Sequence, residues 1–126
     1  MESINVYGAE SSTHTKIALF LEERGMDKDG LVGRSARDLL ANYQKVGIEE
    51  DILLGIALVR AIAQWRAIAH MSGFDPELHQ MQMHHEVSRV AKFLSRQFHT
   101  RSFLVKRPRK SIKKYVEILS QHSTLI

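Results

Sequence analysis

The chain has 126 residues, 44% of them hydrophobic, with 18 Lys or Arg and 14 Asp or Glu for a net charge of +4. This composition suffices for a buried core in about one domain and excludes a disordered chain. The absence of Cys excludes disulfides, thiolate catalysis and cysteine-ligated metal centres. The opening residues lack the basic and apolar regions of a signal peptide, so we expect a cytoplasmic protein.

The charges are divided unevenly along the chain. Residues 1–86 hold 8 basic and 13 acidic side chains, whereas residues 87–126 hold 10 basic side chains and a single carboxylate, Glu117. The C-terminal part is therefore strongly basic, which favours a polyanionic partner.

The N-terminal region predicts a strand followed by two helices. Polar and apolar residues alternate over residues 3–7, which indicates a half-buried strand that ends at Gly8 and is able to pair with a second chain. Hydroxyl side chains at residues 11–13 offer N-caps for a first helix that ends at Gly25. A second helix is expected over residues 34–46.

A third helix, expected over residues 49–72, is apolar in every direction around its axis. Such a helix has to be covered on all sides, and this predicts a homo-oligomer or a subunit of a larger assembly. Arg60 and Arg66 lie near its centre, where each charge costs roughly 2.5–3.5 kcal/mol in a membrane. We therefore expect a core helix and no membrane partner.

The C-terminal region predicts two more helices. Asp75 and Pro76 are typical of the N-cap and first position of a helix, and an apolar stripe continues from there to Phe98. The final helix is expected over residues 111–120, after an extended or irregular segment. The predicted fold class is thus mainly α, with about five helices, a short N-terminal strand and a long central buried helix. We divide it into segments 1–47 and 48–126, packed as one compact unit.

Enzymatic and metal-dependent functions find no support in the motifs. The chain has no nucleophile elbow, no glycine-rich phosphate loop and no paired-carboxylate signature, so we predict no catalytic residues and no cofactor. The histidines at positions 79, 84 and 85 lack the i,i+3 or i,i+4 spacing that brings two ligands to one side of a helix. We therefore predict no metal site.

The basic segment is the strongest functional signal. It runs from Arg89 to Lys114 without a carboxylate, and aromatic rings lie among its cations. Cations that follow phosphates, together with rings able to stack on bases, are typical of nucleic-acid binding. The predicted contact residues are Arg96, Arg101, Lys106, Arg107, Arg109, Lys110, Lys113 and Lys114. The alternative interpretation is a solvated basic face or an arm that docks on an acidic protein surface.

The order strand, helix, loop, helix in the N-terminal third resembles the ribbon–helix–helix DNA-binding superfamily, in particular its conjugative relaxosome TraM family. The resemblance is carried by Ile4–Tyr7, by Ile17–Arg24 and by the segment Gly33–Ala36 that opens the second helix. It implies a dimer or tetramer of plasmid or phage origin that binds DNA rather than RNA. The residues implied to contact DNA are Ser3, Asn5 and Tyr7 at base edges, and Arg34 and Ser35 at a phosphate.

Two alternatives stay open. From Ser35 onward, the helix order and the basic composition resemble the small helical subunit of type III CRISPR effector complexes, which implies backbone binding by residues 101–114 in a ribonucleoprotein. The third hypothesis is a protein–protein adaptor or inhibitor that uses the apolar third helix as its interface.

Overall fold

The computed structural model describes residues 8–43, 47–69, 71–98 and 110–123. This part of the chain forms five α-helices and one short 3-10 helix, so the prediction of a mainly helical protein is confirmed. The elements are α2 (Gly8–Glu23), α3 (Leu31–Tyr43), α4 (Glu50–Ala69), η1 (Met71–Gly73), α5 (Pro76–Gln97) and α7 (Ile112–Ser123).

The predicted fold class is wrong in its strand, because the described part of the chain contains none. The strand was placed on residues 3–7, which lie outside the described residues. Immediately after them, α2 already begins at Gly8, and the hydroxyl residues 11–13 lie inside this helix rather than at its N-cap. The physical reason why residues 8–23 are helical is the helical spacing of Ile17, Phe20 and Leu21, which are buried in the core on one side of α2. The ribbon–helix–helix architecture depends on a strand, and the described part of the chain contains none.

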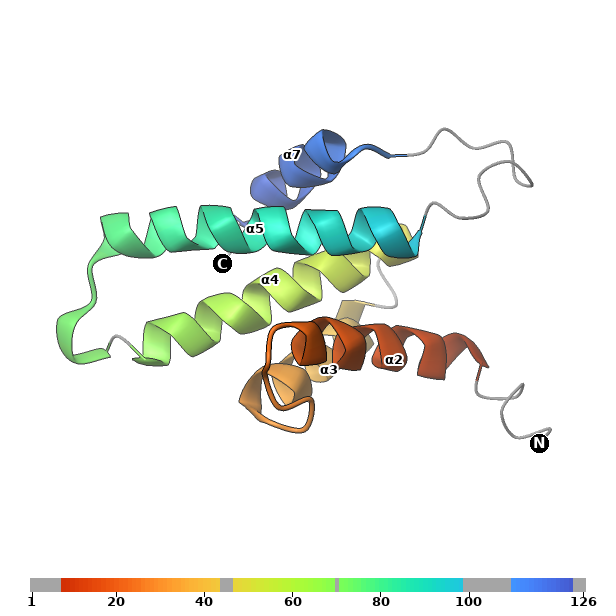
Figure 1. The fold of residues 1–126 in the computed structure, drawn as a ribbon, viewed down its shortest axis with the longest axis horizontal. Coiled ribbons are helices and arrows are strands. Elements are labelled where there is room, and N and C mark those ends of the chain that lie inside the picture. Colours follow the sequence, from red (N-terminus) through yellow and green to blue (C-terminus); the bar gives the residue numbers. More distant parts are fainter. Residues whose placement is uncertain (1–7, 44–46, 70, 99–109, 124–126) are drawn as a thin grey trace.

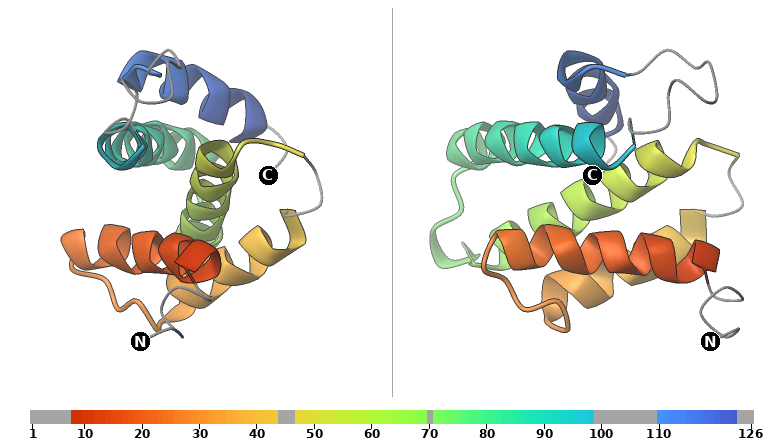
Figure 2. Two further views of the ribbon diagram at one scale, coloured as in Figure 1. Left: turned by 90° about the vertical axis from the view of Figure 1, so that its right-hand side faces the viewer. Right: turned by 45° about the vertical axis from the view of Figure 1, so that its right-hand side comes forward.

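The helices are arranged in three layers around α4. In Figures 1 and 2, α4 runs through the middle, with α5 and α7 on one side and α2 and α3 on the other. One hydrophobic core joins all five α-helices, from Ile17 in α2 to Leu119 in α7. The helices α4, α5 and α7 pack closely at Gly55 of α4, where a Cβ atom would lie 2.8 Å from methyl groups of both Leu94 and Leu119.

The central helix is covered by the chain itself. Residues 51–63 of α4 are buried, apart from the half-buried Arg60. Because α3, α5 and α7 pack around it, cover of residues 51–63 does not require a partner subunit. The oligomeric state itself stays a prediction. Among the described residues, α4 alone is long and apolar enough to cross a membrane, and most of it is buried inside the protein, as in a core helix.

The start of α5 confirms the predicted cap. The Asp75 side chain accepts hydrogen bonds from the backbone N–H groups of Glu77 (3.0 Å) and Leu78 (3.4 Å), and Pro76 follows it at the first position of the helix. Further along, α5 buries Val87, Val90, Ala91, Phe93 and Leu94. Its opposite face is left to the solvent.

A buried ion-pair cluster ties three elements together. Glu86 of α5 is 1% exposed, and its carboxylate accepts hydrogen bonds from two guanidinium groups. Arg24, just after α2, donates to both carboxylate oxygens at 2.5 and 3.1 Å, and Arg66 of α4 donates to Oε2 at 2.8 and 2.6 Å. The cluster thus fixes the end of α2 and the last turns of α4 against the middle of α5.

Candidate nucleic-acid interface

The solvent face of α5 carries a row of basic side chains. His85, Arg89, Lys92 and Arg96, here called the α5 stripe, are spaced by four, three and four residues and are all exposed. This spacing places them on one face of the helix, opposite the buried valines and leucine. At 1.5 Å per residue, the three fully cationic members extend over about 10 Å of the helix axis.

Two members of the stripe have their charges free for a ligand. Within the described part of the chain, no carboxylate pairs with Arg89 or Lys92. Arg96 contacts Glu23 of α2 at 2.8 Å, and both side chains remain largely exposed. An exposed ion pair of this kind contributes at most about 1 kcal/mol, so Arg96 can exchange its partner for a phosphate.

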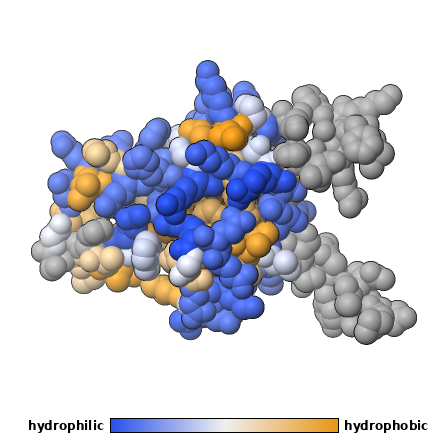
Figure 3. All heavy atoms as spheres, in the orientation of Figure 1, coloured by the Kyte–Doolittle hydropathy of each residue, from blue (hydrophilic) through white to orange (hydrophobic). Residues whose placement is uncertain are grey.

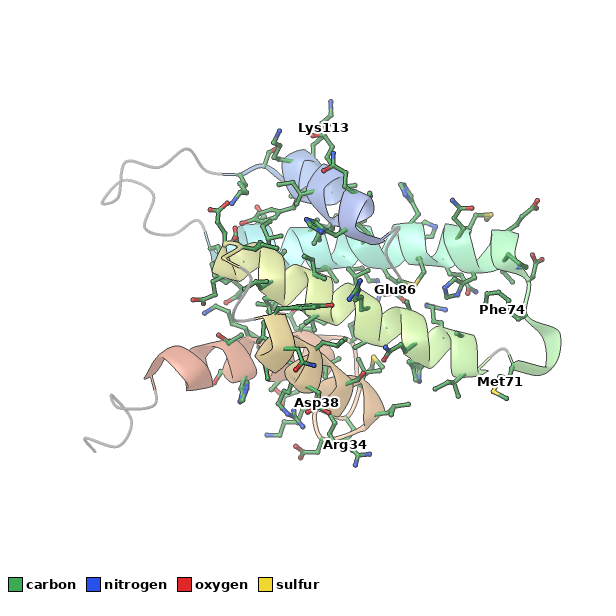
Figure 4. All side chains as sticks on the ribbon, turned by 180° about the vertical axis from the view of Figure 1, so that it is seen from behind. Arg34, Asp38, Met71, Phe74, Glu86 and Lys113 are labelled. Carbon is green, nitrogen blue, oxygen red and sulfur yellow. The ribbon has the colours of Figure 1, made fainter. Side chains whose placement is uncertain are left out.

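Further lysines lie on the helix packed beside α5. Lys113 and Lys114 in the first turn of α7 are both exposed, and Lys113 points away from the bundle in Figure 4. On the face seen in Figure 3, hydrophilic residues dominate the centre of the molecule, across α5. The candidate interface therefore consists of Arg89, Lys92, Arg96, Lys113 and Lys114.

Lys110, in contrast, forms ion pairs with carboxylates within the protein. Its Nζ lies 3.0 Å from Glu49 Oε1 and 3.1 Å from Asp51 Oδ2, and the buried Tyr115 hydroxyl donates to the same Asp51 oxygen at 2.6 Å. The second Asp51 oxygen accepts the backbone N–H of Ile52 at 2.8 Å. This network joins the start of α4 to α7, so the charge of Lys110 is balanced within the protein.

The same network raises two pKa values. Burial raises the pKa of Tyr115 above its ordinary 10.0, and the hydrogen bond to Asp51 raises it further. Burial opposes the charge of Lys110, but hydrogen bonds to Glu49 and Asp51 outweigh it and raise its pKa above 10.5. A proton held more tightly in the folded state stabilises the fold below the unfolded pKa and ceases to do so as the pH rises. Stability is therefore expected to fall above about pH 10.

The Tyr115→Phe variant tests this network. It leaves one oxygen of the buried Asp51 without its hydroxyl donor, so we expect a loss of about 1–3 kcal/mol in the free energy of unfolding at pH 7. Urea denaturation of both proteins measures this loss. The same measurement between pH 9 and 11 should show a shallower decline for the variant, because its phenol no longer titrates. Equal stability of the two proteins at pH 7 would contradict the assignment.

Two residues assigned to a phosphate lie at a different place, on α3. Arg34 is exposed, and Figure 4 shows it at the opposite end of the molecule from Lys113. Its backbone N–H donates to the carbonyl of Gly30 at 3.1 Å, and the Ser35 hydroxyl donates to Gln64 of α4 at 2.7 Å. The helix begins at Leu31, three residues before the predicted start, so these donors are already engaged within the fold.

The remaining predicted contact residues lie outside the described residues; they are Ser3, Asn5, Tyr7, Arg101, Lys106, Arg107 and Arg109. Arg89 and Lys92 belong to the basic segment but not to the predicted contact residues. Their spacing opposite the buried residues Val87, Val90 and Leu94 is the signal that identifies them.

The described part of the chain contains no candidate metal site. In residues 8–43, 47–69, 71–98 and 110–123, no three His, Asp or Glu side chains come together in a way that could hold a metal ion. His84 and His85 are exposed, and the ring of His79 packs at 5.2 Å from that of Phe74.

Fold and site together define a helical bundle with a basic helix face. No protein-family model, curated protein or solved structure was found to match the chain. The resemblances to known families therefore rest on sequence features alone.

Proposed function

We propose that this protein binds nucleic acid without catalysis, by contacting the phosphate backbone through the exposed cations of α5 and the first turn of α7. The observation that carries the proposal is the row formed by Arg89, Lys92 and Arg96 on one rigid helix face. Two of these three charges have no partner among the described residues. A row of unpaired cations attracts a polyanion and releases its condensed counterions on binding.

The length of the row suits a phosphate backbone. One strand of a duplex carries a phosphate for each 3.4 Å or so of axis, so a row of about 10 Å spans roughly three phosphate steps. Contacts from Arg and Lys to phosphates carry no base information. The proposed binding is therefore independent of sequence, and the stripe itself favours neither DNA nor RNA.

Among the earlier hypotheses, a helical basic subunit of a ribonucleoprotein agrees best with this site, because it requires only backbone contacts. In our proposal the contact residues of such a subunit lie on α5 and at the start of α7, rather than over residues 101–114. Docking of the basic segment on an acidic protein surface is the competing interpretation. It predicts that nucleic acid binds weakly or not at all.

The test compares two variants of equal charge. Arg89→Gln/Lys92→Gln removes two charges from the stripe, and Lys28→Gln/Arg34→Gln removes two exposed charges near α3. Fluorescence anisotropy with labelled duplex DNA, single-stranded DNA and RNA at about 50 mM salt measures the affinities. We expect the stripe variant to lose roughly tenfold or more, and the control to lose much less.

Two results would contradict the proposal. Equal losses in both variants would mean that net charge alone governs binding, and the absence of binding by the wild type to all three probes would favour docking on an acidic protein surface. Circular dichroism of both variants checks that the helices are intact.

A further inference from the structure

Exposed apolar side chains gather at one end of the molecule. Most large apolar residues exposed in the described chain lie where α4, η1 and the start of α5 meet. These residues, here called the apolar end, are Ile68 (55% exposed), Met71 (79%), Phe74 (45%), Leu78 (44%) and Met81 (64%). Single exposed apolar residues are ordinary, but a cluster marks an interaction surface.

The figures place this cluster at the α4–α5 connection. Figure 4 shows Met71 and Phe74 close together at the turn, and Figure 3 shows hydrophobic patches at the same end of the molecule. Leu78 and Met81 follow on the first turns of α5, three residues apart, and therefore share a face of that helix. This face continues into the α5 stripe.

Charge changes sign along the exposed face of α5. Carboxylates come first, on the N-cap residue Asp75 and on Glu77 in the first turn; Leu78 and Met81 follow, and then His84, His85 and Arg89. A second α5 helix running antiparallel would set its basic side chains against this acidic start, and its own acidic start against these basic side chains. The face is thus complementary to itself, as a twofold interface requires.

We propose that the apolar end binds a second copy of this chain, with the two α5 helices antiparallel around a twofold axis that passes between Leu78 and Met81. In this register, Leu78 of each copy packs on Met81 of the other. Helical periodicity then places Glu77 of each copy opposite His84 of the other, and the antiparallel helix dipoles favour the same orientation.

This interface is separate from the proposed nucleic-acid site. Arg89, Lys92 and Arg96 lie beyond the contact, so the dimer would carry two basic stripes leading away from the twofold axis. Two linked stripes would raise the avidity for a long polyanion without any new contact. The proposal does not depend on nucleic-acid binding, because dimerisation is measured with the protein alone.

Sedimentation velocity of the full chain over a range of micromolar concentrations provides the test. We expect a concentration-dependent dimer for the wild type and at least a tenfold weaker dimer for Met81→Asp, which puts a carboxylate into the apolar contact. His84→Glu should also weaken the dimer, because it places a carboxylate opposite Glu77 of the other copy. The twofold axis repeats this repulsion, so it occurs at two contacts in each dimer. The double variant His84→Glu/Glu77→Lys should restore it, because the charges are opposite again.

Lys92→Glu is the matched control, two turns further along the same helix face, and should dimerise like the wild type. A monomeric wild type throughout the concentration range would overturn the proposal. So would a double variant as weak as His84→Glu, or a control as weak as Met81→Asp. If Arg89→Gln/Lys92→Gln loses nucleic-acid binding but still dimerises, the binding measurement supports the nucleic-acid site and the sedimentation measurement supports the dimer.

Discussion

Replacement of Glu86 by alanine is expected to lower the free energy of unfolding by about 2–4 kcal/mol. The carboxylate is almost completely buried and accepts four hydrogen bonds from Arg24 and Arg66. Without it, two guanidinium groups face each other with no counter-charge. The arginine side chains are 13% and 22% exposed, so water reaches them and moderates the loss. Urea denaturation monitored by circular dichroism measures it.

The control is an ion pair between similar elements on the surface. Glu23→Ala removes the exposed contact between α2 and Arg96 of α5, and we expect a change below about 1 kcal/mol. If both variants are destabilised equally, the buried Glu86 cluster contributes no more to the free energy of unfolding than the exposed pair of Glu23 and Arg96. A Glu86→Ala protein as stable as the wild type would show that the ion-pair cluster does not stabilise the fold.

Gly33→Ala is expected to destabilise the protein by about 2–3 kcal/mol, although alanine is the better helix former by about 1 kcal/mol. Gly33 is buried in α3, and a Cβ atom there would overlap the backbone carbonyl of Lys28, whose carbon would lie 2.9 Å away. The side chain of Arg37 donates a hydrogen bond to this same carbonyl at 3.0 Å. Because the obstacle is backbone held in place, the loop cannot yield easily.

Gly73→Ala is the matched control for this prediction. A Cβ atom on Gly73 would have no heavy atom within 4 Å, and we expect a change of no more than about 0.5 kcal/mol. Thermal or urea unfolding of the two variants gives the comparison. A Gly33→Ala protein that matches or exceeds the wild type in stability would contradict the close packing of the α2–α3 loop on α3.

Local signals account for the parts of the fold that the sequence predicts well. Asp75 and Pro76 define the start of α5 by side-chain chemistry, and this boundary is confirmed. In contrast, α2 and α3 begin three residues or more before their predicted starts. The hydroxyl residues 11–13 lie inside α2, which begins at Gly8, and α3 begins at Leu31 with Val32 already buried in the core.

The candidate site was predicted only in part, because charge along a sequence does not tell where a side chain points. Lys110 belongs to the basic segment, yet it folds back on Asp51 and Glu49. In the acidic half, Arg24 and Arg66 are likewise used within the protein, on Glu86. The partners of these residues lie 20 to 62 residues away in the sequence, and no local sequence pattern predicts such contacts.

The salt dependence of nucleic-acid affinity shows whether the exposed cations of α5 and α7 contact phosphates. If the five cations of α5 and α7 contact phosphates, the logarithm of the association constant should fall with the logarithm of the salt concentration with a slope of roughly 3–5. Arg89→Gln/Lys92→Gln should reduce this slope by about 1.4–1.8, which corresponds to two lost contacts. An unchanged slope in this variant would show that the α5 stripe does not touch the backbone.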